Sequence, residues 1–98
     1  MIAVIFTSQR TSVKENYLET NDQLEEIAAT LPGFIKTQSA REANGFGISI
    51  SYWETMEDAR QYKQIPEHLI AQQNGKDIWY EWYDVKVCKV ERAYEFKK

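Results

Sequence analysis

The order in which the hydrophobic pattern changes along the chain constrains its fold more than any other feature. Period-two patterns typical of strands alternate with 3.6-residue patterns typical of helices. The predicted strands are residues 1–7, 34–41, 46–53 and 78–96, and the predicted helices are residues 12–30, 55–64 and 66–73. If the last two helices count as one unit, the order is β-α-β-β-α-β, which is the split βαβ or ferredoxin-like arrangement. We therefore predict a single α+β domain over residues 1–98.

The strands differ in how much of their surface is apolar. The first has Ile2, Val4 and Phe6 on one face and Ala3 and Ile5 on the other, so it should lie inside the sheet. The second is polar over residues 36–39 and suits a sheet edge. It is followed by Asn44-Gly45, a good hairpin signal, and then by a regularly alternating strand.

Helix boundaries are marked by local signals. Leu31-Pro32-Gly33 should end the first helix, because proline cannot continue the hydrogen-bond ladder and glycine suits a left-handed turn. Thr55, with Asp58 three residues later, predicts an N-cap for the second helix. Pro66 begins a new helical segment, which should end at Asn74-Gly75.

The pattern also predicts a homodimer. In a split βαβ domain the helices cover one face of the sheet, and an apolar second face would be a larger exposed patch than monomers usually tolerate. The last strand changes parity, as expected if it leaves its own sheet and continues along a partner. Its two apolar sets are Tyr83, Val85 and Val87, then Cys88, Val90, Tyr94 and Phe96. The alternative is one long edge strand that is buried on both faces at its centre.

Composition excludes several classes of function. The net charge is −3, from 12 basic and 15 acidic residues, so we expect no nucleic-acid partner. The single cysteine, Cys88, cannot form an internal disulfide and fits a reducing compartment. The short apolar start lacks a basic segment and is too short for a signal peptide or membrane span. We therefore expect a cytoplasmic protein with no membrane partner.

Several stretches are similar to those that mark one branch of the antibiotic-biosynthesis-monooxygenase family. They include Tyr52-Trp53-Glu54, Pro66-Glu67-His68-Leu69, Trp79-Tyr80 and Val90-Glu91-Arg92-Ala93-Tyr94-Glu95-Phe96, in the right order over nearly the whole chain. The resemblance implies a dimeric α+β barrel, in which two ferredoxin-like sheets close together. It also implies one of several activities, because the family holds cofactor-independent monooxygenases of polycyclic aromatic substrates, haem-degrading enzymes and members with no assigned activity.

Two departures from the family pattern affect these expectations. Many relatives have a histidine where this chain has Ile65, so His68 is the only histidine here. The haem-degrading members use an asparagine on the first strand, where this chain reads Phe6-Thr7-Ser8. Haem binding or degradation therefore ranks third among the possible functions.

His68 is the candidate catalytic residue. Histidine is the side chain whose ordinary pKa lies nearest neutrality, and Gln72 follows one helical turn later. His68 would accept a proton or anchor a ligand; alternatively it is a surface histidine or one that is bound to a neighbouring carbonyl. We predict Trp53, Gln72, Trp82 and Tyr83 as substrate-binding residues, although Trp and Tyr are also typical of cores and interfaces.

No cofactor or metal site is predicted. One histidine and one cysteine twenty residues apart do not make a metal site, and no glycine-rich phosphate loop follows a strand. Two functions are the leading candidates. The first is a small cofactor-independent monooxygenase acting on an aromatic or polycyclic molecule. The second is a non-catalytic small-molecule-binding or stress-related dimeric domain. In either case we expect the site between the sheet and the helices, near Trp53, His68 and Trp82.

Overall fold

The order of secondary-structure elements is the predicted β-α-β-β-α-β. The computed structural model describes residues 1–14 and 16–98, and at positions 66, 67, 70, 75 and 77 it describes the backbone alone. The elements are β1 (Ile2–Arg10), α1 (Tyr17–Thr30), β2 (Phe34–Arg41), β3 (Phe46–Trp53), α2 (Met56–Gln64), α3 (Pro66–Asn74), the π-helical turn η1 (Gly75–Trp79) and β4 (Tyr80–Lys89). The ferredoxin-like α+β prediction is therefore confirmed.

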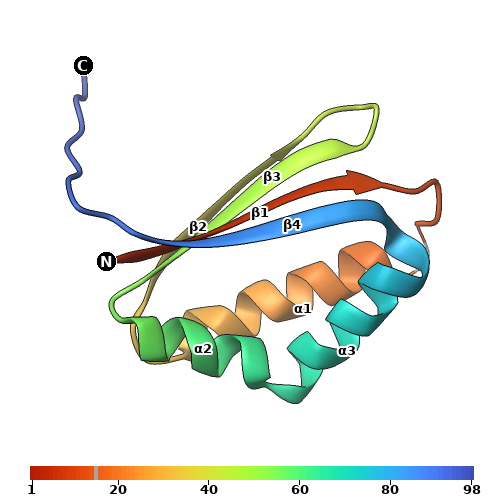
Figure 1. Cartoon of the computed structure of the whole chain (residues 1–98), viewed down its shortest axis with the longest axis horizontal. Helices are drawn as coiled ribbons and strands as arrows, with labels where there is room; N and C mark the ends of the chain where they lie inside the picture. Colours follow the sequence, from red (N-terminus) through yellow and green to blue (C-terminus); the bar gives the residue numbers. More distant parts are fainter. Residues whose placement is uncertain (15) are drawn as a thin grey trace.

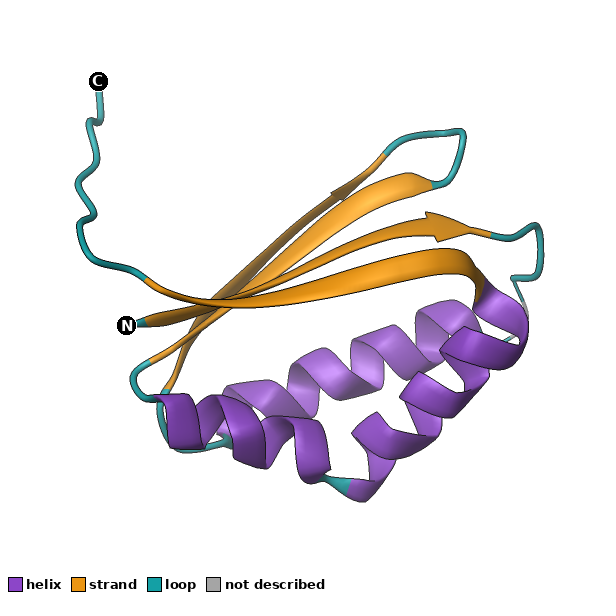
Figure 2. Cartoon of the chain, in the orientation of Figure 1, coloured by secondary structure: helices purple, strands orange, loops and turns teal. Residues whose placement is uncertain are grey.

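The four strands form one antiparallel sheet in the order β2-β3-β1-β4. The interior position predicted for the first strand and the edge position predicted for the second are both confirmed. All three helices lie on one side of this sheet (Figure 1). Colouring by secondary structure shows that, within residues 1–14 and 16–98, no helix covers the opposite side (Figure 2). We call these the helix side and the open side of the sheet.

Two predicted boundaries are wrong. The first helix begins at Tyr17 rather than residue 12; residues 12–14 are not helical, and residue 15 lies outside the described residues. Asn16 has a left-handed backbone (φ 61°), which is incompatible with a helix running through it. The last strand covers Tyr80–Lys89 instead of residues 78–96, because η1 occupies its predicted start. Residues 90–98 have no regular structure and run away from the domain (Figure 1).

The turn between α1 and β2 is packed against the start of α2. Thr55 Oγ1 accepts a hydrogen bond from Asp58 N (3.1 Å), so the predicted N-cap is confirmed. The Thr55 hydroxyl also donates to the Asp58 carboxylate (2.8 Å). Gly33 lies against that carboxylate with φ 79°, and a Cβ at this position would overlap it. Glycine is needed here for both its backbone conformation and its lack of a side chain.

The hydrophobic core lies at one end of the layer between sheet and helices. It is built around Trp53, the last residue of β3, which has no exposed surface. The other buried members are Ile2, Ala28 and Ala59, with Val4, Leu31, Phe34 and Tyr62 packed around them. The alanines let α1 and α2 approach the indole closely. This core holds the near end of α2, and the candidate site is built on it.

Candidate functional site

The strand register shows which side chains form the helix side of the sheet. Residues that are paired across antiparallel strands point to the same face. Three successive rows, given from β2 to β4, are Thr37-Ser51-Val4-Val87, Ser39-Ser49-Phe6-Val85 and Arg41-Gly47-Ser8-Tyr83. The β1/β4 half of this surface is therefore mainly apolar, and the β2/β3 half is mainly made of hydroxyl groups. A flat molecule with a polar edge would match both halves.

Trp53 and His68 are brought together through a third ring, that of Tyr62. The Tyr62 ring stacks on Trp53, with ring centres 5.1 Å apart and an angle of 30°. The His68 and Tyr62 rings are in edge contact, with their centres 4.7 Å apart and an angle of 75° between the planes. The Tyr62 hydroxyl donates a long hydrogen bond to the Leu24 carbonyl (3.4 Å), and Trp53 Nε1 donates to Ser51 Oγ (3.0 Å). Trp53 has no exposed surface, and its ring contact holds Tyr62, which in turn contacts His68. The predicted contact of Trp53 with a substrate stays a prediction.

Tyr62 was not among the predicted site residues. The sequence signal that could have identified it is its spacing, since it lies one turn after Ala59 on the apolar face of α2. Burial, together with the nearby Glu25 carboxylate, raises the pKa of Tyr62 to about 12. The phenol is therefore neutral at physiological pH.

His68 is a neutral imidazole near pH 7. Burial lowers its pKa below the ordinary value of 6.5 and the Lys63 ammonium lowers it further, while the polar backbone of His68 itself partly offsets both effects. Its Nδ1 atom is buried and, among the described residues, has no hydrogen-bond partner. An unpartnered buried nitrogen is unfavourable for stability, and it is available to a ligand that brings its own donor or acceptor.

The helices leave part of the helix side accessible. Val87 belongs to the helix side by register, yet it remains 50% exposed, and Val85 beside it is also exposed. Leu69 on α3 is exposed as well. Gln72, predicted to contact the substrate, is half-buried on α3 one turn after His68. An apolar strip along β4 is therefore open to solvent.

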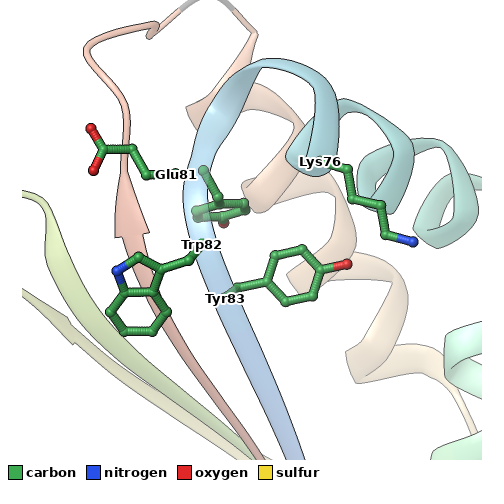
Figure 3. A pocket seen from close by; sticks show the side chains of 5 residues that line it. Lys76, Glu81, Trp82 and Tyr83 are labelled. Atoms are coloured by element: carbon green, nitrogen blue, oxygen red, sulfur yellow. The ribbon is translucent and has the colours of Figure 1, made fainter.

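Trp82 and Tyr83 project to opposite sides of β4 (Figure 3). Tyr83 is on the helix side and contacts the Phe6 ring (centres 5.2 Å apart). Trp82 pairs with Gln9 on the open side, meets the Phe46 ring at 6.2 Å and is 46% exposed. The predicted grouping of Trp82 with Trp53 and His68 is wrong, because neighbouring residues of a strand alternate between faces.

A shallow hollow of about 270 Å³ wraps this edge of β4. Figure 3 shows its lining residues, which are Lys76, Tyr80, Glu81, Trp82 and Tyr83. Tyr80 is on the helix side with Tyr83, and their rings meet at 5.9 Å. The hollow thus lies at the end of the apolar strip.

Comparison with known proteins decides the family. No protein-family model matches the sequence. The chain is 40% identical over 96 residues to a Bacillus subtilis (strain 168) protein, "Uncharacterized protein YqjZ", covering 98% of this chain and 84% of that protein. This chain belongs to the YqjZ family.

Solved structures show that this YqjZ-family chain has the antibiotic biosynthesis monooxygenase fold. A presumed antibiotic biosynthesis monooxygenase from Nitrosomonas europaea has a TM-score of 0.79 and 17% identity, over 94% of this chain and 100% of that one. SnoaB, a cofactor-independent oxygenase from Streptomyces nogalater, has a TM-score of 0.77 and 12% identity, over 94% of each chain. The ferredoxin-like α+β fold that the resemblance implies for one chain is therefore confirmed, and the closing of two such sheets into a dimeric barrel stays a prediction.

In the part of the chain that the structure describes, no three His, Cys, Asp or Glu side chains are grouped so that they could hold a metal ion. Within the same residues, none of the helices combines the length and apolar character needed to cross a membrane.

Proposed function

We propose that this YqjZ-family protein is a cofactor-independent monooxygenase acting on a flat aromatic or polycyclic small molecule. The observation that carries the proposal is His68: a neutral imidazole whose buried Nδ1 has no described partner, beside the Trp53–Tyr62 ring stack. Perturbed, incompletely satisfied titratable groups cluster at functional sites. The fold shared with SnoaB supports the same reading by analogy.

The substrate would lie on the helix side of the sheet. Phe6, Tyr83 and the exposed Val85 and Val87 offer an apolar surface that matches a fused-ring face. The hydroxyls of Ser49 and Ser51, in the same rows, would meet its polar edge. We keep Gln72 as a contact because it is half-buried one turn from His68.

The chemistry needs only a proton acceptor and an electron-rich substrate. Neutral His68 removes a proton from an acidic carbon or phenol, and the resulting anion transfers electrons to O₂. One oxygen atom forms the new carbon–oxygen bond, and the other leaves as water. For a CH₂ group between aromatic rings the balance is CH₂ + O₂ → C=O + H₂O.

A non-catalytic small-molecule-binding role is the second candidate, and one observation favours it. Catalytic histidines are usually oriented by a hydrogen bond from their second nitrogen to a carboxylate or carbonyl. Among the described residues no such group meets His68 Nδ1. A protein that only binds an aromatic molecule would not need that orientation.

The test is oxygen uptake by the full chain with an anthrone-type tricyclic phenol, comparing wild type with His68→Gln. We expect the rate of oxygen uptake by the variant to be lower by a factor of about 10² to 10⁴. The matched control is Arg60→Gln on the exposed face of α2, which should keep full activity. An active His68→Gln variant would remove His68 from the mechanism. A wild-type protein that is stabilised by the phenol but consumes no oxygen would favour the binding role.

We also propose that two copies pack with their open sides together. Ile48 and Trp82 are exposed on that side, and Ile5, Ile50 and Tyr52 share it by register. An apolar surface of this kind is usually an interface in soluble proteins. The dimer would also shield the sheet beneath the proposed substrate.

A further inference from the structure

Two arginines hold a pair of tyrosines at the end of the helix side where β1 and β2 finish. The hydroxyls of Tyr17 and Tyr80 are hydrogen-bonded at 3.1 Å. The guanidinium of Arg10 lies on the Tyr17 ring, 3.4 Å from its centre. It is fixed there by hydrogen bonds to the carbonyls of Trp79 (3.2 Å) and Val13 (2.6 Å).

Arg41 reaches the same place from β2. Its Nη2 donates to the buried Ser8 hydroxyl (2.9 Å), and its Nη1 donates to the Gly45 carbonyl (2.5 Å). Its guanidinium is 6.0 Å from the centre of the Tyr80 ring. Gly47 lies between Arg41 and Ser8 in the register, and a Cβ there would be 2.7 Å from the guanidinium carbon. The absence of a side chain at Gly47 lets Arg41 cross the strand.

Neither arginine is neutralised within the described residues. The ion pairs found there are Lys86–Asp84 and Lys97–Glu95, and both lie elsewhere. Tyr80 is uncharged, because burial and the hydrogen bond with Tyr17 raise its pKa. Each guanidinium also keeps a nitrogen with no described acceptor, Nη1 of Arg10 and Nε of Arg41.

A cavity of about 360 Å³ opens between these two arginines. It is lined by Arg10, Thr11, Ser12, Lys14, Arg41, Glu42, Ala43, Asn44 and Gly45. Three of these side chains are cationic and one is anionic, in a chain whose overall charge is −3. This local reversal of sign favours an anion, and the volume suits a small anionic group.

We propose that this cavity binds a small oxyanion, the carboxylate or phosphate group of a small molecule. Guanidinium groups offer paired N–H donors whose geometry matches both groups. The contacts to Trp79, Val13, Ser8 and Gly45 hold the two guanidinium groups in place before the anion arrives, which lowers the entropic cost of binding. The site does not depend on oxygenase activity, since it uses none of the residues assigned to that role.

Isothermal titration of the full chain with inorganic phosphate and with benzoate, at constant ionic strength, tests the proposal. We expect one saturable site per chain for at least one of the two anions, and the anion that saturates identifies the group. Arg41→Gln should weaken binding by about tenfold or more, since charge-assisted hydrogen bonds are lost. Lys14→Gln should weaken it less, and because Lys14 is exposed this variant should fold normally even if Arg41→Gln does not.

The matched control is Arg60→Gln, which removes the same charge from an exposed position outside the cavity. It should bind like the wild type. Equal weakening in Arg60→Gln and Arg41→Gln would mean that only general charge attraction is involved, and would overturn the proposal. Failure of both anions to saturate would also overturn it, whatever the result of the oxygen-uptake assay.

Discussion

His68 and Tyr62 show how burial changes two neighbouring side chains in opposite directions. Desolvation disfavours the charged form of each group, so it lowers the pKa of the imidazole and raises that of the phenol. Both are therefore neutral at pH 7. A neutral phenol cannot act as a base, whereas a neutral imidazole can. Of the two rings in contact, His68 is the one suited to accept a proton.

The stability of the protein should depend on pH through His68. Because its pKa is lowered in the folded state, the unfolded chain binds more protons between that lowered value and 6.5. The contribution of His68 to the free energy of unfolding is therefore fully present above about pH 6.5. It decreases as the pH falls from 6.5 to the pKa of the folded state, and it does not change further below that pKa. Thermal unfolding of wild type and His68→Gln between pH 5 and 8 measures it.

Comparison with His68→Gln isolates the effect of His68 on stability. The carboxylates titrate in both proteins, so their effect cancels in the difference between the two curves. We expect the wild-type melting temperature to fall more steeply than that of His68→Gln below pH 6.5. Parallel curves would show that His68 titrates alike in the folded and unfolded states. His68 is the only histidine, so its NMR titration assigns the pKa directly.

At the level of elements, β4 and the segment after it differ sharply. β4 ends at Lys89, and Val90 N still donates to Met1 O (2.9 Å). Beyond that hydrogen bond the chain leaves the domain, with Tyr94 87% exposed and Phe96 85% exposed. Aromatic rings that are so exposed in a single chain suggest that this segment packs against a partner molecule, which would bury them. The predicted continuation along a second copy stays a prediction.

Removing residues 90–98 should weaken the proposed dimer while leaving the domain folded. The described contacts of the domain lie before this segment apart from the Val90 hydrogen bond, so its loss should cost little within one chain. The matched control removes residues 97–98 alone and should keep both rings and full dimerisation. Size-exclusion chromatography over a dilution series measures the difference. A shortened chain that dimerises as tightly as the control would contradict the crossing-strand prediction.

At the level of the whole molecule, the helix side of the sheet is covered and the open side is not. The helices lie on the helix side (Figure 2), and the core residues Ile2 and Trp53 face them from the sheet. The open side bears the exposed Ile48 and Trp82, which contribute nothing to the core. For a chain of this size the added burial of a second copy would give a large share of the total stability.

Sedimentation should therefore show a homodimer at micromolar concentration. Ile48→Lys should shift it towards the monomer, because an unpaired charge would be buried between the two sheets. Leu18→Lys is the control, since Leu18 is exposed on α1 on the other side of the molecule. A wild-type protein that sediments as a monomer would contradict the proposed dimer. Equal behaviour of the two variants would place the interface elsewhere.

Local pattern was sufficient to predict the order of the α-helices and strands, the interior position of β1, the edge position of β2 and the Thr55 cap, but it missed the π-helical turn η1. These depend on side-chain periodicity and on hydrogen bonds between residues close in sequence. The placement of Trp82 could also have been found locally, since it has the opposite parity to Tyr83. Only the tertiary structure joined His68 to Trp53 through Tyr62, and Arg41 to Ser8 across Gly47. Those contacts depend on strand register and on how α2 and α3 pack, which no short stretch of sequence specifies.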